Sequence, residues 1–184
     1  MFKTTINFFA FQAGWLGCVL GAANGMPWVG PVIIAMVAGL HLNIVPQPGR
    51  EVMILLAALV IGTLADSLLM ATGWVSYREG LWIPGLAPVW LLAMWVGFAT
   101  TLNGCMRWLR ERPMLAAAFG FVGGPAAYYA GARLGAMSFD NLPAGLLALA
   151  LIWALVMPVL YALARRFDGT LTGGANPRTT WVTS

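Results

Sequence analysis

Residues 52–70, with the sequence VMILLAALVIGTLADSLLM, decide the fold of this chain. The stretch is almost wholly apolar and contains a single ionisable residue, Asp66. A helix of about 20 apolar residues crosses the hydrocarbon of a bilayer, and a charge there costs roughly 3 kcal/mol on insertion scales. The stretch therefore predicts a membrane-spanning helix in which Asp66 is paired, turned inward or close to water.

The composition extends this prediction to the whole chain. The 184 residues are 60% hydrophobic and 9% charged, with a mean hydropathy of +0.81. A soluble domain carries about 25% charged residues, and a chain this short cannot hide its apolar surface in a very large core. We therefore expect a polytopic membrane protein in contact with the lipid bilayer.

Five more apolar stretches qualify as spans, and together they predict an all-α bundle of six transmembrane helices. Turns and helix-start prolines separate them, such as Asn24-Gly25 before Pro27 and the sequence PQPG at 46–49. The expected helices cover about residues 5–22, 27–45, 52–70, 86–106, 113–134 and 142–164. Residues 1–166 form the transmembrane domain, and residues 167–184, rich in Gly, Thr and Asn, form a flexible cytoplasmic tail.

The distribution of Lys and Arg predicts which way these helices run. In this topology eight of the ten basic residues lie on one side: Lys3, Arg50, Arg107, Arg110, Arg112, Arg165, Arg166 and Arg178. Arg78 and Arg133 lie on the other. Cytoplasmic loops carry the excess of basic residues, so we expect both termini on the cytoplasmic side of a bacterial inner membrane. The sequence pI near 9.6 then reflects topology and anionic headgroups rather than nucleic acid.

A cleaved signal peptide is a competing interpretation of residues 1–25. They have a basic start, an apolar run and small residues at the end, and Leu16-Gly17-Cys18 resembles a lipoprotein box. Asn7 and Gln12 interrupt the apolar run, however, and Trp15 stands where such a box has Leu. We favour a first membrane-spanning helix, and the other five spans keep their orientation in either case.

Four polar residues are candidates for a site in the outer part of the membrane: Asp66, Arg133, Tyr128 and Asn24. At about 1.5 Å per residue, Asp66 and Arg133 lie at compatible depths near the outer ends of the third and fifth helices. One interpretation is structural: the two charges clamp these helices together, or Arg133 reaches to the headgroups. In the other, the four residues line an outward-facing polar pocket, where Asp66 binds a cation or a proton and Arg133 an anionic head.

The longest outer connector, residues 71–85, carries several aromatic residues beside Arg78 and Glu79. Residues 75–77 and 81–83 are expected to form a small hairpin on the membrane surface. This connector is interpreted either as an aromatic anchor at the interface or as a lid over an outward-facing cavity.

A second polar cluster is expected near the cytoplasmic side: Asn7, His41, Asn43 and Asn103. His41 is the only histidine, and it is interpreted as a hydrogen-bonded helix-end residue or as a proton relay. Gln12 lies near the middle of the membrane, where it makes an interhelical hydrogen bond or forms part of a cavity.

The chain lacks the residue patterns of familiar enzymes. A single His excludes a bis-histidine haem, and Cys18 and Cys105 lie toward opposite faces, so we expect no metal, no cofactor and no disulfide. The motifs of serine hydrolases, zinc proteases and phosphate-binding loops are missing from the sequence. The six acidic residues scatter over both sides. We therefore expect that the protein is not an enzyme.

Small residues form one continuous face on each of two expected helices. The first helix places Asn7, Ala10, Gly14, Gly17 and Gly21 at steps of three and four, and the fifth places Gly120, Gly124, Ala127, Gly131 and Gly135. Helices in lipid associate through such faces, so we expect both helices to be central and the apolar sixth helix to be peripheral. Alternatively, these glycines dock another membrane protein.

Several motifs resemble one bacterial family of unknown function. They are NFFAFQAGW at 7–15, GTLADS at 62–67, PVW at 88–90 with FATTL at 98–102, and GGPAAYY at 123–129. The family comprises small inner-membrane proteins of proteobacteria, and the resemblance covers nearly the whole chain except the tail. It implies an inner-membrane location and a lipid-related role, because such proteins are encoded near lipid-modifying enzymes.

The six spans and the small-residue first helix also look like the substrate-binding subunits of energy-coupling-factor vitamin transporters. In that family the small residues dock to the coupling subunit. The first outer connector here is very short and no vitamin-specific motif is present, so this likeness concerns the fold alone.

Three functions follow in order of preference. The first is a small transporter-like or substrate-binding membrane protein with an outward-facing polar pocket. The second is a non-catalytic accessory protein of a membrane-lipid pathway that binds a partner through its small-residue faces. A membrane enzyme comes third.

Overall fold

The fold is an all-α bundle, as the sequence predicts. A computed structural model describes residues 2–171 and contains six α-helices in that range. They are α1 Phe2–Ala23, α2 Val29–Ile44, α3 Pro48–Ala71, α4 Val89–Leu102, α5 Pro113–Arg133 and α6 Leu142–Arg166. A short 3-10 turn, η1 Arg107–Leu109, and two strands, β1 Val75–Ser76 and β2 Ser138–Phe139, lie in the connectors.

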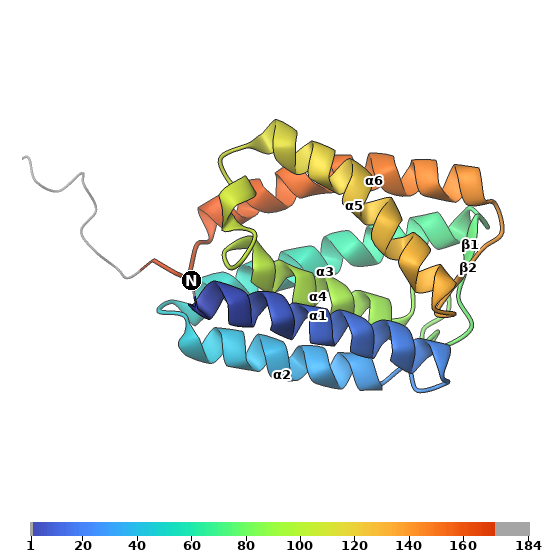
Figure 1. Ribbon diagram of the computed structural model, residues 1–184, viewed down its shortest axis with the longest axis horizontal. Helices are drawn as coiled ribbons and strands as arrows, with labels where there is room; N and C mark the ends of the chain where they lie inside the picture. Colours follow the sequence, from blue (N-terminus) through green and yellow to red (C-terminus); the bar gives the residue numbers. More distant parts are fainter. Residues whose placement is uncertain (1, 172–184) are drawn as a thin grey trace, which may run out of the picture.

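The helices run along the long axis of the molecule and reverse direction at each connector (Figure 1). α4 packs against α1, α2 and α3, and α6 packs against α3, α4 and α5. The start of α1 and the end of α6 lie at the same end of the bundle, and the two strands lie at the other (Figure 1). The bundle thus has one end that carries the start of α1 and the end of α6, and one end that carries β1 and β2.

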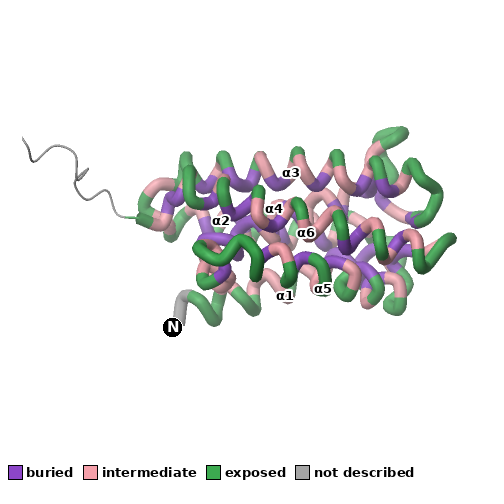
Figure 2. The backbone as a smooth tube through the Cα atoms, turned by 90° about the horizontal axis from the view of Figure 1, so that it is seen from above, coloured by how far each residue is buried: buried purple, intermediate pink, exposed green. Residues whose placement is uncertain are grey.

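In the part of the chain that the structure describes, three helices are long and apolar enough to cross a membrane: Thr4–Ala23, Pro48–Ala71 and Leu142–Arg166. Exposed residues follow the outer sides of the helices (Figure 2), and many are large and apolar, such as Leu155 with 72% exposure. Such apolar outer faces indicate a membrane protein.

Six transmembrane helices are not confirmed. α2 and α4 have 16 and 14 residues, which at 1.5 Å per residue is less than the roughly 30 Å of the hydrocarbon. The expected fourth span, 86–106, is shorter because Pro88 precedes its first turn and a turn begins at Asn103. α5 is long enough, but its glycines and prolines lower its hydropathy.

The small-residue faces are used inside the chain. A side chain at Gly14 or Gly17 would overlap Ile34 or Ile33, so this face of α1 is closed by α2. A side chain at Gly120 or Gly124 would overlap Trp153 of α6. The tight glycine contacts that helices in lipid use to associate are therefore made between α1 and α2 and between α5 and α6.

Two expectations about helix positions are wrong. α5 packs extensively against α6 alone and is not central, while α6 contacts three helices and is not peripheral. Trp153 explains both differences. Gly120 and Gly124 of α5 lie against its backbone carbonyl and its indole, respectively, and the indole stacks on Trp95 of α4, with ring centroids 4.5 Å apart.

The expected hairpin between 75–77 and 81–83 is also absent from the described residues. β1 pairs instead with β2 in antiparallel register, with Val75 opposite Phe139 and Ser76 opposite Ser138. Gly145 makes room for the Phe139 ring beside this pair. The strands therefore join the α3–α4 connector to the α5–α6 connector.

The glycine contacts predict opposite effects for two Gly→Ala substitutions. Gly120→Ala is expected to cost about 1–3 kcal/mol, because its Cβ would overlap the Trp153 carbonyl, which moves only with α6. Gly39→Ala, on α2 with open space around it, is expected to stabilise the helix by about 0.5–1 kcal/mol. Thermal unfolding of both variants in one detergent measures the difference. Equal effects would show that the α5–α6 contact does not depend on glycine.

Candidate functional site

Asp66 lies at the junction of three helices. It is 2% exposed, and its two carboxylate oxygens accept hydrogen bonds from Trp95 Nε1 and from the Tyr128 hydroxyl, each at 2.6 Å. Gly62 lies one turn earlier on α3, and any side chain there would overlap the Trp95 ring. Gly62 thus makes room for the indole that Asp66 binds, and one carboxylate joins α3, α4 and α5.

The predicted pair of Asp66 and Arg133 does not form in the described part of the chain. Arg133 is exposed at the end of α5, and Tyr128 reaches Asp66 instead. Arg133 lies five positions after Tyr128. It is therefore about 7.5 Å further along the helix, and its side chain is on a different helix face. Arg133 is therefore turned away from the carboxylate.

Asn24 does not join this group either. It is exposed at the end of α1, where its side chain donates to the Leu20 carbonyl at 2.8 Å. Of the four predicted outer residues, the structure brings together Asp66 and Tyr128 only. The outward-facing polar pocket is thus not formed by these four residues.

Tyr77, in the connector after β1, lies near the same carboxylate. Its side chain is buried, and its ring packs edge-on against Trp90 at 5.8 Å. Burial, and then the negative charge of Asp66, raise the pKa of Tyr77 well above its ordinary value. The phenol therefore stays neutral, and its buried hydroxyl has no hydrogen-bond partner within residues 2–171.

A cavity of about 390 Å³ lies between α1, α4, α5 and α6. Its wall is largely apolar and aromatic, and includes Trp15, Trp90, Trp95, Phe98, Tyr128 and Trp153. Trp95 and Tyr128 belong both to this wall and to the hydrogen bonds of Asp66. The carboxylate therefore lies behind the wall and fixes two of its rings.

The cavity opens sideways between α1 and α5. Phe119 and Ala127 of α5 line it and are also exposed on the outside of the molecule. Phe11 and Trp15 line it from α1. α5 runs obliquely to α1 (Figure 1) and lacks the close packing that it has with α6, so the space between them leads to the outer surface of the helices.

Three polar side chains of the cavity wall, Gln12, Trp15 and Trp153, have no hydrogen-bond partner among the described residues. Gln12 lines the cavity from α1 without a hydrogen bond. Trp153 Nε1 is buried and unpaired; the Tyr128 hydroxyl is close enough to interact with it but lies outside hydrogen-bond geometry. An unpaired buried donor costs about 1–3 kcal/mol. Of the two interpretations of Gln12, an interhelical hydrogen bond or part of a cavity, the structure agrees with the second.

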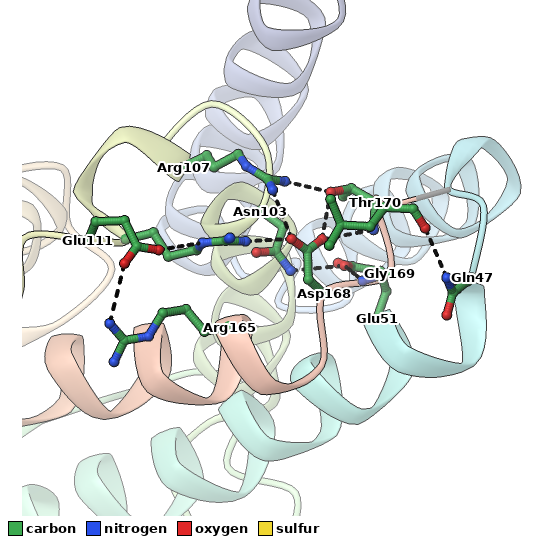
Figure 3. A network of polar contacts seen from close by, with 11 residues as sticks. Gln47, Glu51, Asn103, Arg107, Glu111, Arg165, Asp168, Gly169 and Thr170 are labelled. Carbon is green, nitrogen blue, oxygen red and sulfur yellow. Dashed lines mark hydrogen bonds and ion pairs between the residues drawn. The ribbon is translucent and has the colours of Figure 1, made fainter. Parts of the chain in front are cut away.

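At the end of the bundle that carries the start of α1 and the end of α6, the polar cluster has a centre that the sequence did not indicate. Glu51 of α3 is fully buried and binds His41 Nε2 at 2.9 Å, Asn103 Nδ2 at 2.9 Å and the Gly169 backbone N–H at 2.8 Å. Figure 3 shows Glu51 and Asn103 close together, next to the segment that follows α6 and contains Gly169. The structure thus brings His41 and Asn103 together through Glu51.

The other two predicted members of this cluster lie apart. Asn7 caps the end of α4, donating to the Thr100 carbonyl at 3.2 Å and accepting from the Cys105 N–H at 2.9 Å. Asn43 is exposed and donates to the Gly39 carbonyl of its own helix at 2.7 Å. Within the described residues, no group of three or more His, Cys, Asp or Glu side chains could hold a metal ion.

Residues 167–171, the start of the expected tail, are packed against the bundle (Figure 3). Asp168 binds Arg107 at 2.9 Å and also Arg110. The Gly169 carbonyl accepts from the Gln47 N–H at 3.0 Å. Burial alone would raise the pKa of Asp168, but hydrogen bonds from Thr170 and Arg110 and the charge of Arg107 lower it overall. Residues 172–184 of the tail lie outside the described residues.

Three residues of these sites had no feature in the sequence to single them out. Trp95 and Tyr77 looked like other aromatic residues of a membrane protein. Glu51 followed Arg50 just before a predicted span, where a carboxylate faces water in most helices. Its burial depends on Gly169, which lies more than 100 residues later in the sequence and folds back over it.

A comparison with known proteins finds one family. The profile of a family described as "Protein of unknown function (DUF2878)" matches residues 4–159. This range contains Glu51, Asp66 and the whole cavity wall. No curated protein and no solved structure matches the chain.

The hydrogen bonds of Asp66 predict different effects for two charge-removing variants. Asp66→Asn leaves one of the Trp95 and Tyr128 donors without an acceptor, and we expect it to cost about 2 kcal/mol. Arg133→Gln, at an exposed position, is expected to change stability by less than about 0.5 kcal/mol. Thermal unfolding of the single and double variants measures both effects, which should add. A double variant that recovers the stability lost in Asp66→Asn would show that the two charges are coupled.

The ion pairs of Asp168 predict a pH dependence. Because its folded pKa is lowered, Asp168 stabilises the docked segment above its ordinary pKa near 3.8, and this contribution is lost as pH falls through the lowered pKa. We expect Asp168→Asn to speed amide hydrogen exchange at residues 167–171 about tenfold at pH 7, which corresponds to ~1.4 kcal/mol.

The control is Glu111→Gln, because Glu111 is 71% exposed and pairs with Arg110 and Arg165 at 3.3 and 3.7 Å. Such exposed pairs contribute about 0–1 kcal/mol, so exchange at residues 167–171 should stay close to wild type. The difference between wild type and Asp168→Asn should shrink below pH 4. A difference independent of pH would contradict the role of the ionised carboxylate.

Proposed function

Because the chain belongs to the DUF2878 family of proteins of unknown function, we propose its function from the geometry: it binds the hydrocarbon chain of a membrane lipid. The observation that carries this proposal is the cavity of about 390 Å³ between α1, α4, α5 and α6. Ligand pockets in proteins have volumes of roughly 300–1,000 Å³ and mostly apolar walls. The cavity has the size of such a pocket.

The position of the cavity favours a lipid over a water-soluble substrate. Its opening lies between α1 and α5, and α1 is one of the helices that can cross a membrane. A chain entering there leaves the bilayer hydrocarbon and never crosses water. A water-soluble substrate would lose its hydration on entering this cavity. An apolar wall offers few hydrogen bonds to offset that loss.

The aromatic wall is suited to hold such a chain firmly. Trp95 and Trp153 are stacked, and Phe98 meets Trp153 edge-on at 5.2 Å. The hydrogen bonds of Asp66 fix Trp95 and Tyr128 from behind. A wall that is ordered before the ligand arrives loses little conformational entropy on binding.

This proposal replaces the polar outward pocket with an apolar one and keeps the role of a substrate-binding membrane protein. The alternative of a partner docked on the small-residue faces is less favoured, because Ile33, Ile34 and Trp153 already cover four of those glycines: Gly14, Gly17, Gly120 and Gly124. The excess of Lys and Arg around the expected cytoplasmic connectors supports cytoplasmic termini and an inner-membrane location.

The test is photolabelling with a stearic acid that carries a diazirine in mid-chain. The purified protein in phosphatidylcholine vesicles should be labelled on the cavity wall, and Ala127→Trp should reduce this labelling about tenfold by filling the cavity, a difference of ~1.4 kcal/mol. Ala126→Trp is the matched control, since Ala126 is exposed beside Ala127 on α5 but does not line the cavity.

Mass spectrometry of the labelled peptides gives the outcome. Label on the α1 and α5 residues of the cavity, lost in Ala127→Trp and kept in Ala126→Trp, supports the proposal. Label spread evenly over the lipid-facing side of α3, with no difference between the two variants, would overturn it.

A further inference from the structure

We infer that the chain bound in the cavity carries a mid-chain oxygen, a hydroxyl or a carbonyl, that accepts hydrogen bonds from Gln12 and Trp153. This inference rests on the proposed function and names the class of lipid. It starts from Gln12 and Trp153, two of the polar side chains of the cavity wall that have no hydrogen-bond partner in the described part of the chain.

Gln12 differs from the other amide side chains of its surroundings. Asn7, on the same helix, is bonded to the end of α4, and Asn24, just after it, is bonded to Leu20. Gln12 lies between them on α1, faces the cavity and makes no hydrogen bond with a described residue. Its carboxamide is therefore available to a ligand.

Trp153 differs in the same way from Trp90 and Trp95, two other indoles of the cavity wall. Trp95 Nε1 donates to Asp66, and Trp90 Nε1 donates to the Glu79 carbonyl at 3.1 Å. Trp153 Nε1 is also buried, but it has no hydrogen-bond partner among the residues that the structure describes. Buried polar groups in proteins nearly always have a partner, so an exception on a cavity wall points to a partner that occupies the cavity.

The Trp153 ring cannot turn to find a partner elsewhere. It is stacked on Trp95 with an interplanar angle of 10°, and it also lies against Gly124. The nearby Tyr128 hydroxyl donates its proton to Asp66; its oxygen could also accept, but it lies outside hydrogen-bond geometry with Trp153 Nε1. The group that pairs with Trp153 must therefore come to it.

The chemistry of these two groups defines what the ligand offers. An indole N–H only donates, so its partner must be an acceptor. The Gln12 amide donates through nitrogen and accepts through oxygen, so it can bind a carbonyl or both sides of a hydroxyl. An ordinary saturated chain offers neither, and it would leave both groups unpaired.

The depth of these residues places the oxygen along the chain. Gln12 lies near the middle of α1, and Trp153 lies near the middle of α6. Both helices can cross a membrane, so the middle of each is about 15 Å from either surface of the hydrocarbon. The ester and carboxyl groups of a lipid lie at that surface, so the oxygen belongs to the middle of the chain.

The test is competition for the same diazirine-stearate labelling by stearic, 2-hydroxystearic and 12-hydroxystearic acids at equal mole fraction in the vesicles. For wild type we expect 12-hydroxystearic acid to compete about tenfold better than the other two, the size expected for one hydrogen bond to an otherwise unpaired buried group. The 2-hydroxy acid controls for the hydroxyl itself, because its oxygen stays near the surface.

Gln12→Leu removes the amide and keeps an apolar side chain of similar size. It should retain labelling and lose the preference for the 12-hydroxy acid, and Trp153→Phe should do the same. Asn43→Leu is the control, since Asn43 is exposed and outside the cavity, and it should keep the preference. Gln12→Leu decides the question if Trp153→Phe does not fold.

The outcomes separate this inference from the proposed function. Labelling that all three acids displace equally in wild type would overturn the mid-chain oxygen and leave lipid binding intact. Labelling that none of them displaces would overturn lipid binding itself. A preference for the 12-hydroxy acid that survives in Gln12→Leu would show that Gln12 does not contact the oxygen.

Discussion

A carboxylate buried among apolar helices must take hydrogen bonds from the donors that lie nearest, and in this chain those donors are two aromatic rings. Asp66 accepts a hydrogen bond from Trp95 on one carboxylate oxygen and from Tyr128 on the other. Each bond to a charged acceptor contributes about 1.5–3 kcal/mol. Because the rings come from α4 and α5, the relative positions of α3, α4 and α5 depend on this one side chain. The cavity depends on it too, since both rings form part of its wall.

The cavity follows from where the glycines allow close approach. Gly62 lets the Trp95 ring lie against α3, while Gly120 and Gly124 let Trp153 lie against α5. The two indoles then stack between the helices. α5 is thereby held against α6 and away from α1, and the space left between α1 and α5 is not filled by any side chain. An aromatic wall and an open side thus arise from the same contacts.

The sequence predicted the all-α fold, the long apolar helices and the closeness of Asp66 and Tyr128. These follow from periodicity, length and depth, which are local properties of each helix. The partner of Asp66 was mistaken, because a cation was sought for a buried charge, whereas neutral N–H and O–H donors satisfy a carboxylate as well. The Glu51 cluster depends on a segment that folds back from the far end of the chain. No local pattern reports such a contact.

The unpaired groups are not spread evenly over the molecule. Three buried polar side-chain atoms of the described residues lack a partner: the Tyr77 hydroxyl, Asn103 Oδ1 and Trp153 Nε1. The first lies at the end of the bundle that carries β1 and β2, and the second in a cluster whose other members are bonded to one another. Only Trp153 lines the cavity. Since a donor without an acceptor is harder to tolerate than an acceptor with an unused lone pair, its position on that wall is the strongest reason to expect an oxygen there.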